Sequence, residues 1–131
     1  MTKQTFPDRP WVMVVDDEEV ITRLLETQLR RLNYNSAVAH SAAEALRVMH
    51  EAPRPFDLLI ADYKMPQTSG IELAAQVHSA YPAMPIILCT GDDTALRGLD
   101  LGRHGIIAVA LKPLTPVEFA RLLEAGLDTG V

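Results

Sequence analysis

Five short, mostly apolar runs recur along this sequence, and a segment with apolar residues at helical spacing follows each of them. A short apolar run without alternating polar residues is typical of a strand buried on both faces of a parallel sheet, because right-handed crossovers lay helices over each face. The runs therefore predict an α/β fold, a doubly wound sheet of five parallel strands. The strands are expected at residues 11–15, 36–39, 57–61, 85–89 and 106–111, and the second is the weakest.

Helix start signals lie between these runs. Ser69 precedes Glu72 by three residues, a spacing that predicts a capping box, in which each side chain bonds the free backbone N–H of the other residue. A polar turn after the fourth run predicts a further helix from about Asp93, with Leu96 and Leu99 on its apolar side. Each run therefore has a helix to follow it.

The length of 131 residues favours one domain with a core of its own. We expect this domain at 11–128, after a proline-containing tail or linker at 1–10 and before a C-terminal tail at 129–131. The chain has only 12 Lys and Arg residues but 17 Asp and Glu residues, and this excess of negative charge argues against direct binding of nucleic acid. A single cysteine, Cys89, and the lack of a long apolar run favour a cytoplasmic protein without a membrane segment.

Polar residues stand at the carboxyl ends of the expected strands: Asp16 and Asp17 after the first, Asp62 after the third, Thr90 after the fourth and Lys112 after the fifth. In an open α/β sheet of order 2-1-3-4-5, these ends line one edge, and the ligand crevice lies between strands one and three. We therefore expect Asp17 and Asp62 to flank the crevice.

Carboxylates brought this close require either a hard divalent cation or strongly raised pKa values, and Mg²⁺ is the better fit because it leaves positions for phosphate oxygens. A carboxylate at such a site can act as a nucleophile on phosphorus. The hydroxyl of Thr90 and the ammonium of Lys112 would stabilise the charge that develops on the phosphoryl oxygens. The expected chemistry is phosphoryl transfer to an aspartate.

These residues, taken in order, resemble the receiver domains of two-component response regulators, of the single-domain chemotaxis-regulator type and of hybrid sensor kinases. The resemblance covers about residues 11–128 and implies a flavodoxin-like (βα)5 fold. It rests on Asp16-Asp17-Glu18, on Asp62 with Met65-Pro66 and Gly70, on Thr90-Gly91 and on Lys112-Pro113.

The resemblance also implies a role for each site residue. Asp62 would be the phosphoacceptor, and Thr90 and Lys112 would contact the phosphoryl group. Four groups would hold Mg²⁺, the implied cofactor: Asp17 and Asp62 directly, Asp16 through water, and the backbone carbonyl of Lys64. The chain would promote only its own phosphorylation and dephosphorylation, and so would not be an enzyme acting on a separate substrate.

Partners follow from the same resemblance. The phosphoryl donor would be a histidine kinase or a histidine phosphotransfer protein, and the output would be contact with a downstream protein. A homodimer would use the face made by the helix from about Asp93, the strand 106–111 and the helix that begins near Thr115. One position departs from the family pattern: Val109 stands where the family usually has a switching Tyr or Phe.

Other interpretations remain open for the sequence alone. Acidic residues after a strand can simply favour a helix N-terminus. A receiver-shaped adaptor could work without phosphorylation, and a flavodoxin-like mononucleotide binder would share the fold. The acidic loop 16–18 would repel a nucleotide phosphate unless metal were present. A magnesium-dependent phosphohydrolase would want a second acid two residues after Asp62, where this chain has Lys64.

Overall fold

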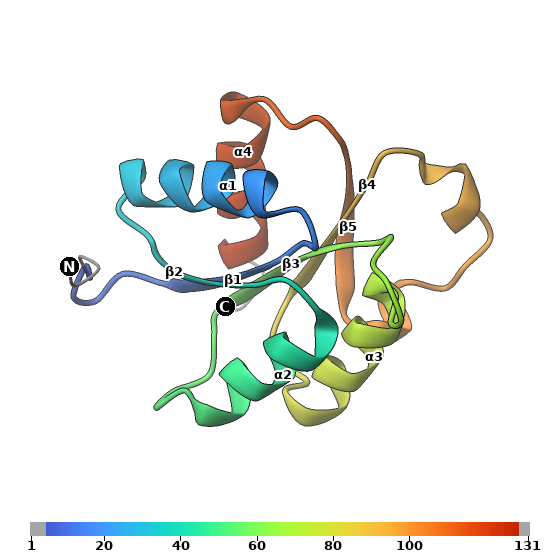
Figure 1. The fold of residues 1–131 in the computed structure, drawn as a ribbon, viewed down its shortest axis with the longest axis horizontal. Coiled ribbons are helices and arrows are strands. Elements are labelled where there is room, and N and C mark those ends of the chain that lie inside the picture. The colour runs from blue at the N-terminus through green and yellow to red at the C-terminus, as the bar shows by residue number, and fades with distance from the viewer. Residues whose placement is uncertain (1–4, 129–131) are drawn as a thin grey trace.

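A computed structural model describes residues 5–128 of the chain; the predicted tail 129–131 and the first residues of the predicted tail 1–10 lie outside the described part. Five parallel strands form one sheet in the order β2-β1-β3-β4-β5 (Figure 1). The predicted doubly wound, flavodoxin-like fold is confirmed. The strands are β1 (Trp11–Val15), β2 (Asn35–Ala39), β3 (Leu58–Asp62), β4 (Ile86–Thr90) and β5 (Ile106–Leu111).

The central strands are buried on both faces, which explains their continuous apolar sequences. Every residue of β3 and of β4 is buried, and four of the five residues of β1 are buried. The parallel register aligns Val15 of β1 with Ala61 of β3, and Asp62 with Cys89 of β4. The carboxyl ends of these three strands therefore stop at nearly the same level.

Helices cover the two faces of the sheet in pairs (Figure 1). One apolar cluster includes Leu29 of α1 and Phe119 of α4, and the other includes Met49 of α2 and Leu73 of α3. The capping box of Ser69 and Glu72 forms as predicted at the start of α3. The helices are α1 (Glu19–Arg31), α2 (Ala42–Glu51), α3 (Gly70–Ala80) and α4 (Pro116–Asp128).

The prediction of a helix from about Asp93 is wrong. The chain between β4 and β5 instead makes two single 3-10 turns, η1 (Asp93–Leu96) and η2 (Gly102–His104). Leu96 is buried, but Leu99 is 51% exposed, so the apolar spacing does not produce a helical face. Gly98 adopts φ +80, a left-handed conformation that ends a helix, and so interrupts the segment.

β5 is the outermost strand of the sheet, next to β4, and part of it is exposed. Val109 and Leu111 are 36% and 51% exposed, whereas Ala110 between them is buried. The face that the resemblance assigned to a homodimer therefore lacks the first of its three elements.

Residues before β1 lie against the sheet. The side chain of Asn35, which is buried, accepts a hydrogen bond from the backbone N–H of Phe6 at 2.6 Å and donates to the carbonyls of Phe6 and Arg9. The Arg9 guanidinium lies 4.8 Å from the centre of the Tyr34 ring. These contacts hold residues 6–9 beside β2.

Within residues 5–128, none of the helices combines the length and the apolar character that crossing a membrane requires.

Candidate functional site

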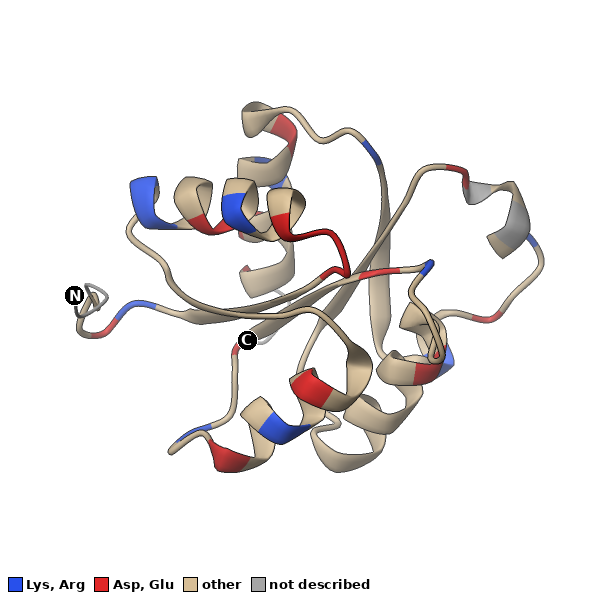
Figure 2. Cartoon of the chain, viewed as in Figure 1, with Lys and Arg blue, Asp and Glu red and all other residues tan. Residues whose placement is uncertain are grey.

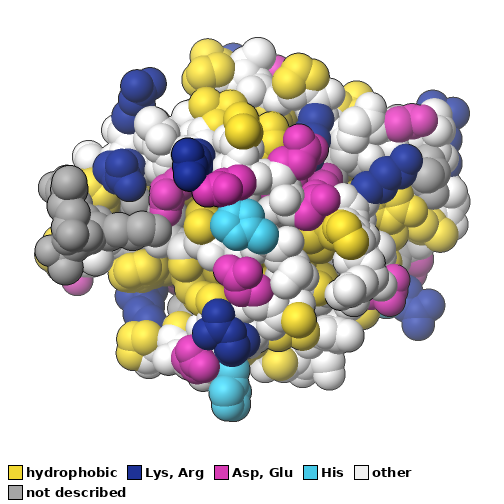
Figure 3. Space-filling model, in the orientation of Figure 1, with side chains coloured by type: hydrophobic (Ala, Val, Ile, Leu, Met, Phe, Trp, Pro, Cys, Tyr) yellow, Lys and Arg dark blue, Asp and Glu magenta, His cyan; other side chains and the backbone are white. Residues whose placement is uncertain are grey.

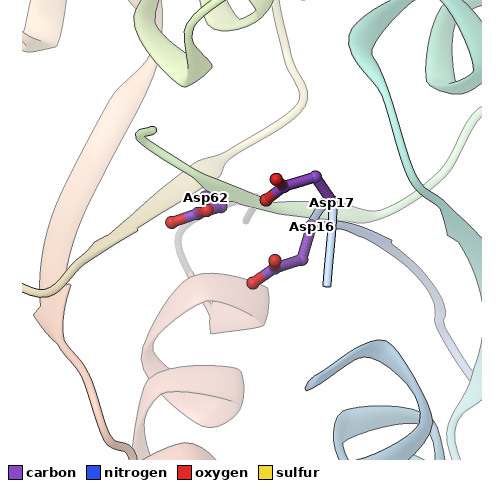
Figure 4. Close-up of side chains that lie close together, drawn as sticks. All are labelled: Asp16, Asp17 and Asp62. Carbon is purple, nitrogen blue, oxygen red and sulfur yellow. The ribbon is translucent and has the colours of Figure 1, made fainter. Parts of the chain in front are cut away.

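Three aspartates meet at the carboxyl edge of the sheet, where acidic residues follow two neighbouring strands (Figure 2). Asp16 and Asp17 come directly after β1, and Asp62 is the last residue of β3. Each offers one carboxylate oxygen, and these oxygens lie within 4.8 Å of one another (Figure 4). Acidic side chains also gather near the middle of the face in Figure 3. The point where the strand order reverses is therefore a concentrated acidic site.

Lys112, which follows β5, extends to this site. Its Nζ lies 2.7 Å from Oδ2 of Asp16 and 3.1 Å from Oδ1 of Asp62. The other oxygen of Asp16 accepts a hydrogen bond from the backbone N–H of Glu18 at 2.9 Å. Asp16 is thus buried with both oxygens bonded, while Asp17 beside it is exposed. Two aspartates are fixed in position, and the third faces solvent.

The pKa of Asp62 is raised from its ordinary value, first because burial disfavours its charged form and also because Asp16 and Asp17 are negative. The hydrogen bond from Lys112 acts in the opposite direction and lowers it. Burial alone would lower the pKa of Lys112, but its bonds to Asp16 and Asp62 outweigh burial and raise that pKa. Lys112 is therefore a stable cation that helps to keep Asp62 ionised.

The donor set fits a hard divalent cation. Three carboxylates and one ammonium carry formal charges of −3 and +1, so the site has a net charge of −2. Burial is the largest cause of the raised pKa of Asp62, and the negative charges of Asp16 and Asp17 add to it. Oxygen ligands from a few carboxylates, with solvent access at Asp17, are what Mg²⁺ prefers. Asp16, Asp17 and Asp62 are the residues that could hold this ion.

The two remaining residues of the expected site, Thr90 and Lys64, make no hydrogen bond or ion pair with the acidic group among residues 5–128. Thr90 is buried at the end of β4, and its hydroxyl donates to the carbonyl of Asp92 at 3.0 Å and accepts from the Asp92 N–H at 3.2 Å. Lys64, two residues after Asp62, has an exposed side chain. The hydroxyl of Thr90 is therefore bound to its own loop, while Lys112 already contacts Asp62.

Two features of the site were not predicted from the sequence. A cavity of about 120 Å³ beside Asp62 and Lys112 has an apolar wall that includes Ile21, Leu24 and Leu114. In addition, a Cβ on Gly70 would overlap the backbone carbonyl of Asp62 and lie 2.7 Å from Cδ1 of Leu88. The missing side chain of Gly70 therefore lets α3 begin directly against the end of β3.

The chain is similar to a known protein family and to known proteins. The family described as "Response regulator receiver domain" matches residues 12–124. The two-component response regulator ARR14 of Arabidopsis thaliana is 31% identical over 120 residues, which are 89% of this chain and 31% of that protein. The regulatory protein VanR of Enterococcus faecium is 33% identical over 119 residues, 88% of this chain and 49% of that protein. The chain thus spans less than half the length of these two curated relatives.

The fold is also similar to solved structures. The response regulator receiver domain protein (CheY-like) of Methanospirillum hungatei JF-1 matches with a TM-score of 0.86 at 25% identity, over 94% of this chain and 97% of that one. The family match covers the three aspartates, Thr90 and Lys112, together with β1 from Val12 onward and the other four strands in full. The chain belongs to the response regulator receiver domain family.

Proposed function

We propose that this domain accepts a phosphoryl group on Asp62 in a Mg²⁺-dependent reaction and passes the signal on through protein contacts. The observation that carries the proposal is the position of Asp62, whose carboxylate lies 3.1 Å from the Lys112 ammonium and within 4.8 Å of the carboxylates of Asp16 and Asp17. A nucleophile, a cation and a metal-binding acidic pair thus share one edge of the sheet. Membership of the receiver family supports the same assignment.

The transfer step uses the groups gathered at this edge of the sheet. A carboxylate oxygen of Asp62 attacks phosphorus, an O–P bond forms, and the P–N bond of a phosphohistidine breaks. The imidazole of the donor leaves with the electron pair of that bond. Lys112 offsets the negative charge on the phosphoryl oxygens. A bound Mg²⁺ would supply further charge neutralisation at these oxygens. The donor is then a histidine kinase or a histidine phosphotransfer protein.

The exposed position of Asp17 gives a direct test of the metal. We expect Asp17→Asn to raise the Mg²⁺ concentration needed for half-maximal phosphorylation by roughly tenfold or more, because one of the few charged ligands is lost. The measurement is phosphoprotein formation from a small phosphodonor across a Mg²⁺ titration, with EDTA as the zero point. Asp92→Asn is the matched control, because Asp92 is also exposed and its carboxylate bonds only to Thr94 within residues 5–128.

Equal phosphorylation of the wild-type protein with and without EDTA would contradict the metal assignment. A complete lack of phosphorylation under all conditions would instead favour the adaptor that works without phosphorylation. The two results can be distinguished, because the first yields a phosphorylated protein and the second yields none.

The switch is expected in the chain that follows β4. If Thr90 turns toward a phosphoryl group on Asp62, both of its hydrogen bonds to Asp92 break, and the turn at residues 91–97 loses its anchor. Val109, which is stiff and has no polar tip, cannot supply the usual ring movement. We therefore expect Val109→Ala to leave phosphorylation intact.

Amide hydrogen exchange would locate this response. Exchange with and without a phosphate mimic such as beryllium fluoride should change mainly at residues 91–103. Changes confined to residues 20–50 would show that the signal takes another route.

A further inference from the structure

The acidic segment that follows β1 is attached to the end of β2 at two places. The backbone N–H of Asp16 donates to the carbonyl of Ala39, the last residue of β2, at 3.1 Å. Further along, in the first turn of α1, the hydroxyl of Thr22 lies 3.0 Å from Nε2 of His40, the residue that follows Ala39. Two consecutive residues at the end of β2 therefore hold both ends of the segment 16–22.

The hydrogen bonds of Thr22 decide the direction of its contact with His40. A threonine hydroxyl has one proton, and that of Thr22 donates to the carbonyl of Glu19 at 2.9 Å. The oxygen of Thr22 then accepts from His40, whose Nε2 carries the proton. Thr22 is 1% exposed, so solvent does not compete for this position. The imidazole thus donates a hydrogen bond to a buried hydroxyl in the first turn of α1.

The start of α1 lacks the support that two other helices have. Ser41 and Ser69 cap the first turns of α2 and α3 with side-chain hydrogen bonds, whereas Glu18, the N-cap residue of α1, makes no such bond in the described part of the chain. The carbonyl of Glu18 accepts from the N–H of Thr22, and the N–H of Glu18 donates to the carboxylate of Asp16. A displacement of Thr22 is therefore passed through Glu18 to the acidic loop.

Among the three aspartates, Asp17 depends most on this support. Asp16 is buried and bonded to Lys112, and Asp62 is the last residue of a fully buried strand. Asp17 is exposed, so the backbone on either side of it sets where its carboxylate stands. Because Mg²⁺ requires nearly ideal octahedral geometry, a small change in this backbone is expected to weaken binding of the ion.

We propose that His40 is a positioning residue for the metal site. Its imidazole acts through the hydroxyl of Thr22 to hold the first turn of α1, and thereby keeps the carboxylate of Asp17 where Mg²⁺ requires it. In this role His40 contacts neither the ion nor a phosphoryl group. The inference rests on the proposed function, because it assumes that Mg²⁺ binds at Asp16, Asp17 and Asp62.

The first test is Mg²⁺ binding to the unphosphorylated protein, measured by isothermal titration calorimetry without a phosphodonor. We expect His40→Leu and Thr22→Val to raise the Kd for Mg²⁺ about threefold to tenfold, less than the roughly 10–100-fold that direct partners of metal ligands contribute. Thr22→Val nearly keeps the shape of the side chain but removes the hydroxyl. Thr22→Ser keeps the hydroxyl and removes a methyl group, so it should bind Mg²⁺ like the wild type, which a role in packing alone would not allow.

Thr27 and His50 provide matched controls. The hydroxyl of Thr27 also donates to a carbonyl of α1, that of Arg23, at 2.9 Å, but Thr27 is exposed. His50 is an exposed residue of α2. Thr27→Val and His50→Leu should therefore leave the Kd for Mg²⁺ at its wild-type value.

A double-mutant cycle tests whether His40 acts through Asp17. Asp17→Asn removes the carboxylate that His40 is proposed to position. In the Asp17→Asn background, His40→Leu should therefore change the Kd for Mg²⁺ by less than about twofold, because the two effects are not independent. Thermal unfolding of each variant would show that the fold is retained.

Nitrogen NMR of the imidazole tests the direction of the hydrogen bond. In a neutral histidine ring one nitrogen carries the proton and the other does not. We expect Nε2 of His40 to carry it, because the oxygen of Thr22 accepts. Removal of this acceptor in Thr22→Val should increase the share of the tautomer that is protonated on Nδ1.

Three results would overturn the role of His40. One is a Kd for Mg²⁺ that His40→Leu and Thr22→Val leave unchanged. Another is a loss of affinity that is equally large in the Asp17→Asn background. The third is a neutral ring of His40 that carries its proton on Nδ1 in the wild-type protein. A wild-type protein that binds no Mg²⁺ would instead refute the metal site on which the inference rests, so the two failures can be told apart.

Discussion

Asp62→Asn protein is expected to lose phosphorylation to background when it is incubated with a labelled small phosphodonor and Mg²⁺. An amide oxygen is a poor nucleophile, and the substituted side chain cannot form the acyl phosphate. The fold should persist, because Asn has nearly the shape of Asp and a neutral amide costs less to bury than a carboxylate. Lys112 keeps its 2.7 Å contact with Asp16. Intact-mass spectrometry would measure the phosphoryl group, and circular dichroism would check the fold.

The matched control is Asp8→Asn. Asp8 lies before β1, at the opposite end of that strand from Asp16 and Asp17, and its left-handed φ of 63 is one that Asn tolerates. This variant should incorporate phosphate like the wild type. Undiminished incorporation into Asp62→Asn protein, mapped to another residue, would remove Asp62 as the phosphoacceptor.

Gly70→Ala is expected to destabilise the domain by about 1–3 kcal/mol, the usual cost of forcing a methyl group into a packed site. The added Cβ would overlap the Asp62 carbonyl and approach Cδ1 of Leu88, so either α3 or the end of β3 must move. The better helix propensity of Ala recovers at most about 1 kcal/mol. Thermal unfolding should show a midpoint several degrees lower. Phosphorylation should also slow, because small displacements of a reacting group are costly.

Gly91→Ala separates this effect from glycine replacement in general. Gly91 also follows a strand at the same edge of the sheet, but no atom lies within 4 Å of the position its Cβ would take. The unfolding midpoint of the Gly91→Ala protein should stay near that of the wild type or rise slightly. A midpoint for Gly70→Ala equal to that of Gly91→Ala would show that α3 and β3 accommodate the methyl group.

Much of the fold and most of the acidic site could be predicted from the sequence. Buried parallel strands need continuous apolar runs, so β1, β3 and β4 appear directly in the residue pattern. Residues that follow such strands must lie at one edge, which predicts that Asp16, Asp17 and Asp62 lie together, as they do. Both inferences rest on properties that each segment carries by itself.

The segment between β4 and β5 could not be predicted in the same way. Leu96 and Leu99 have helical spacing, but Gly98 adopts a left-handed conformation, and Leu96 packs into the core while Leu99 stays exposed. A short periodic pattern holds too little free energy to form a helix without a packing surface.

The sequence by itself determined the strand and helix order, the edge at which the functional side chains meet and the family to which the chain belongs, because these depend on local apolar patterns and on motif residues in order. Only the tertiary structure decided that Lys112 bonds both Asp16 and Asp62 and that Gly70 must have no side chain. Each of these features joins atoms far apart along the chain or depends on space that other elements fill. The spacing of residues along a sequence specifies neither the distances between such atoms nor the space left between elements.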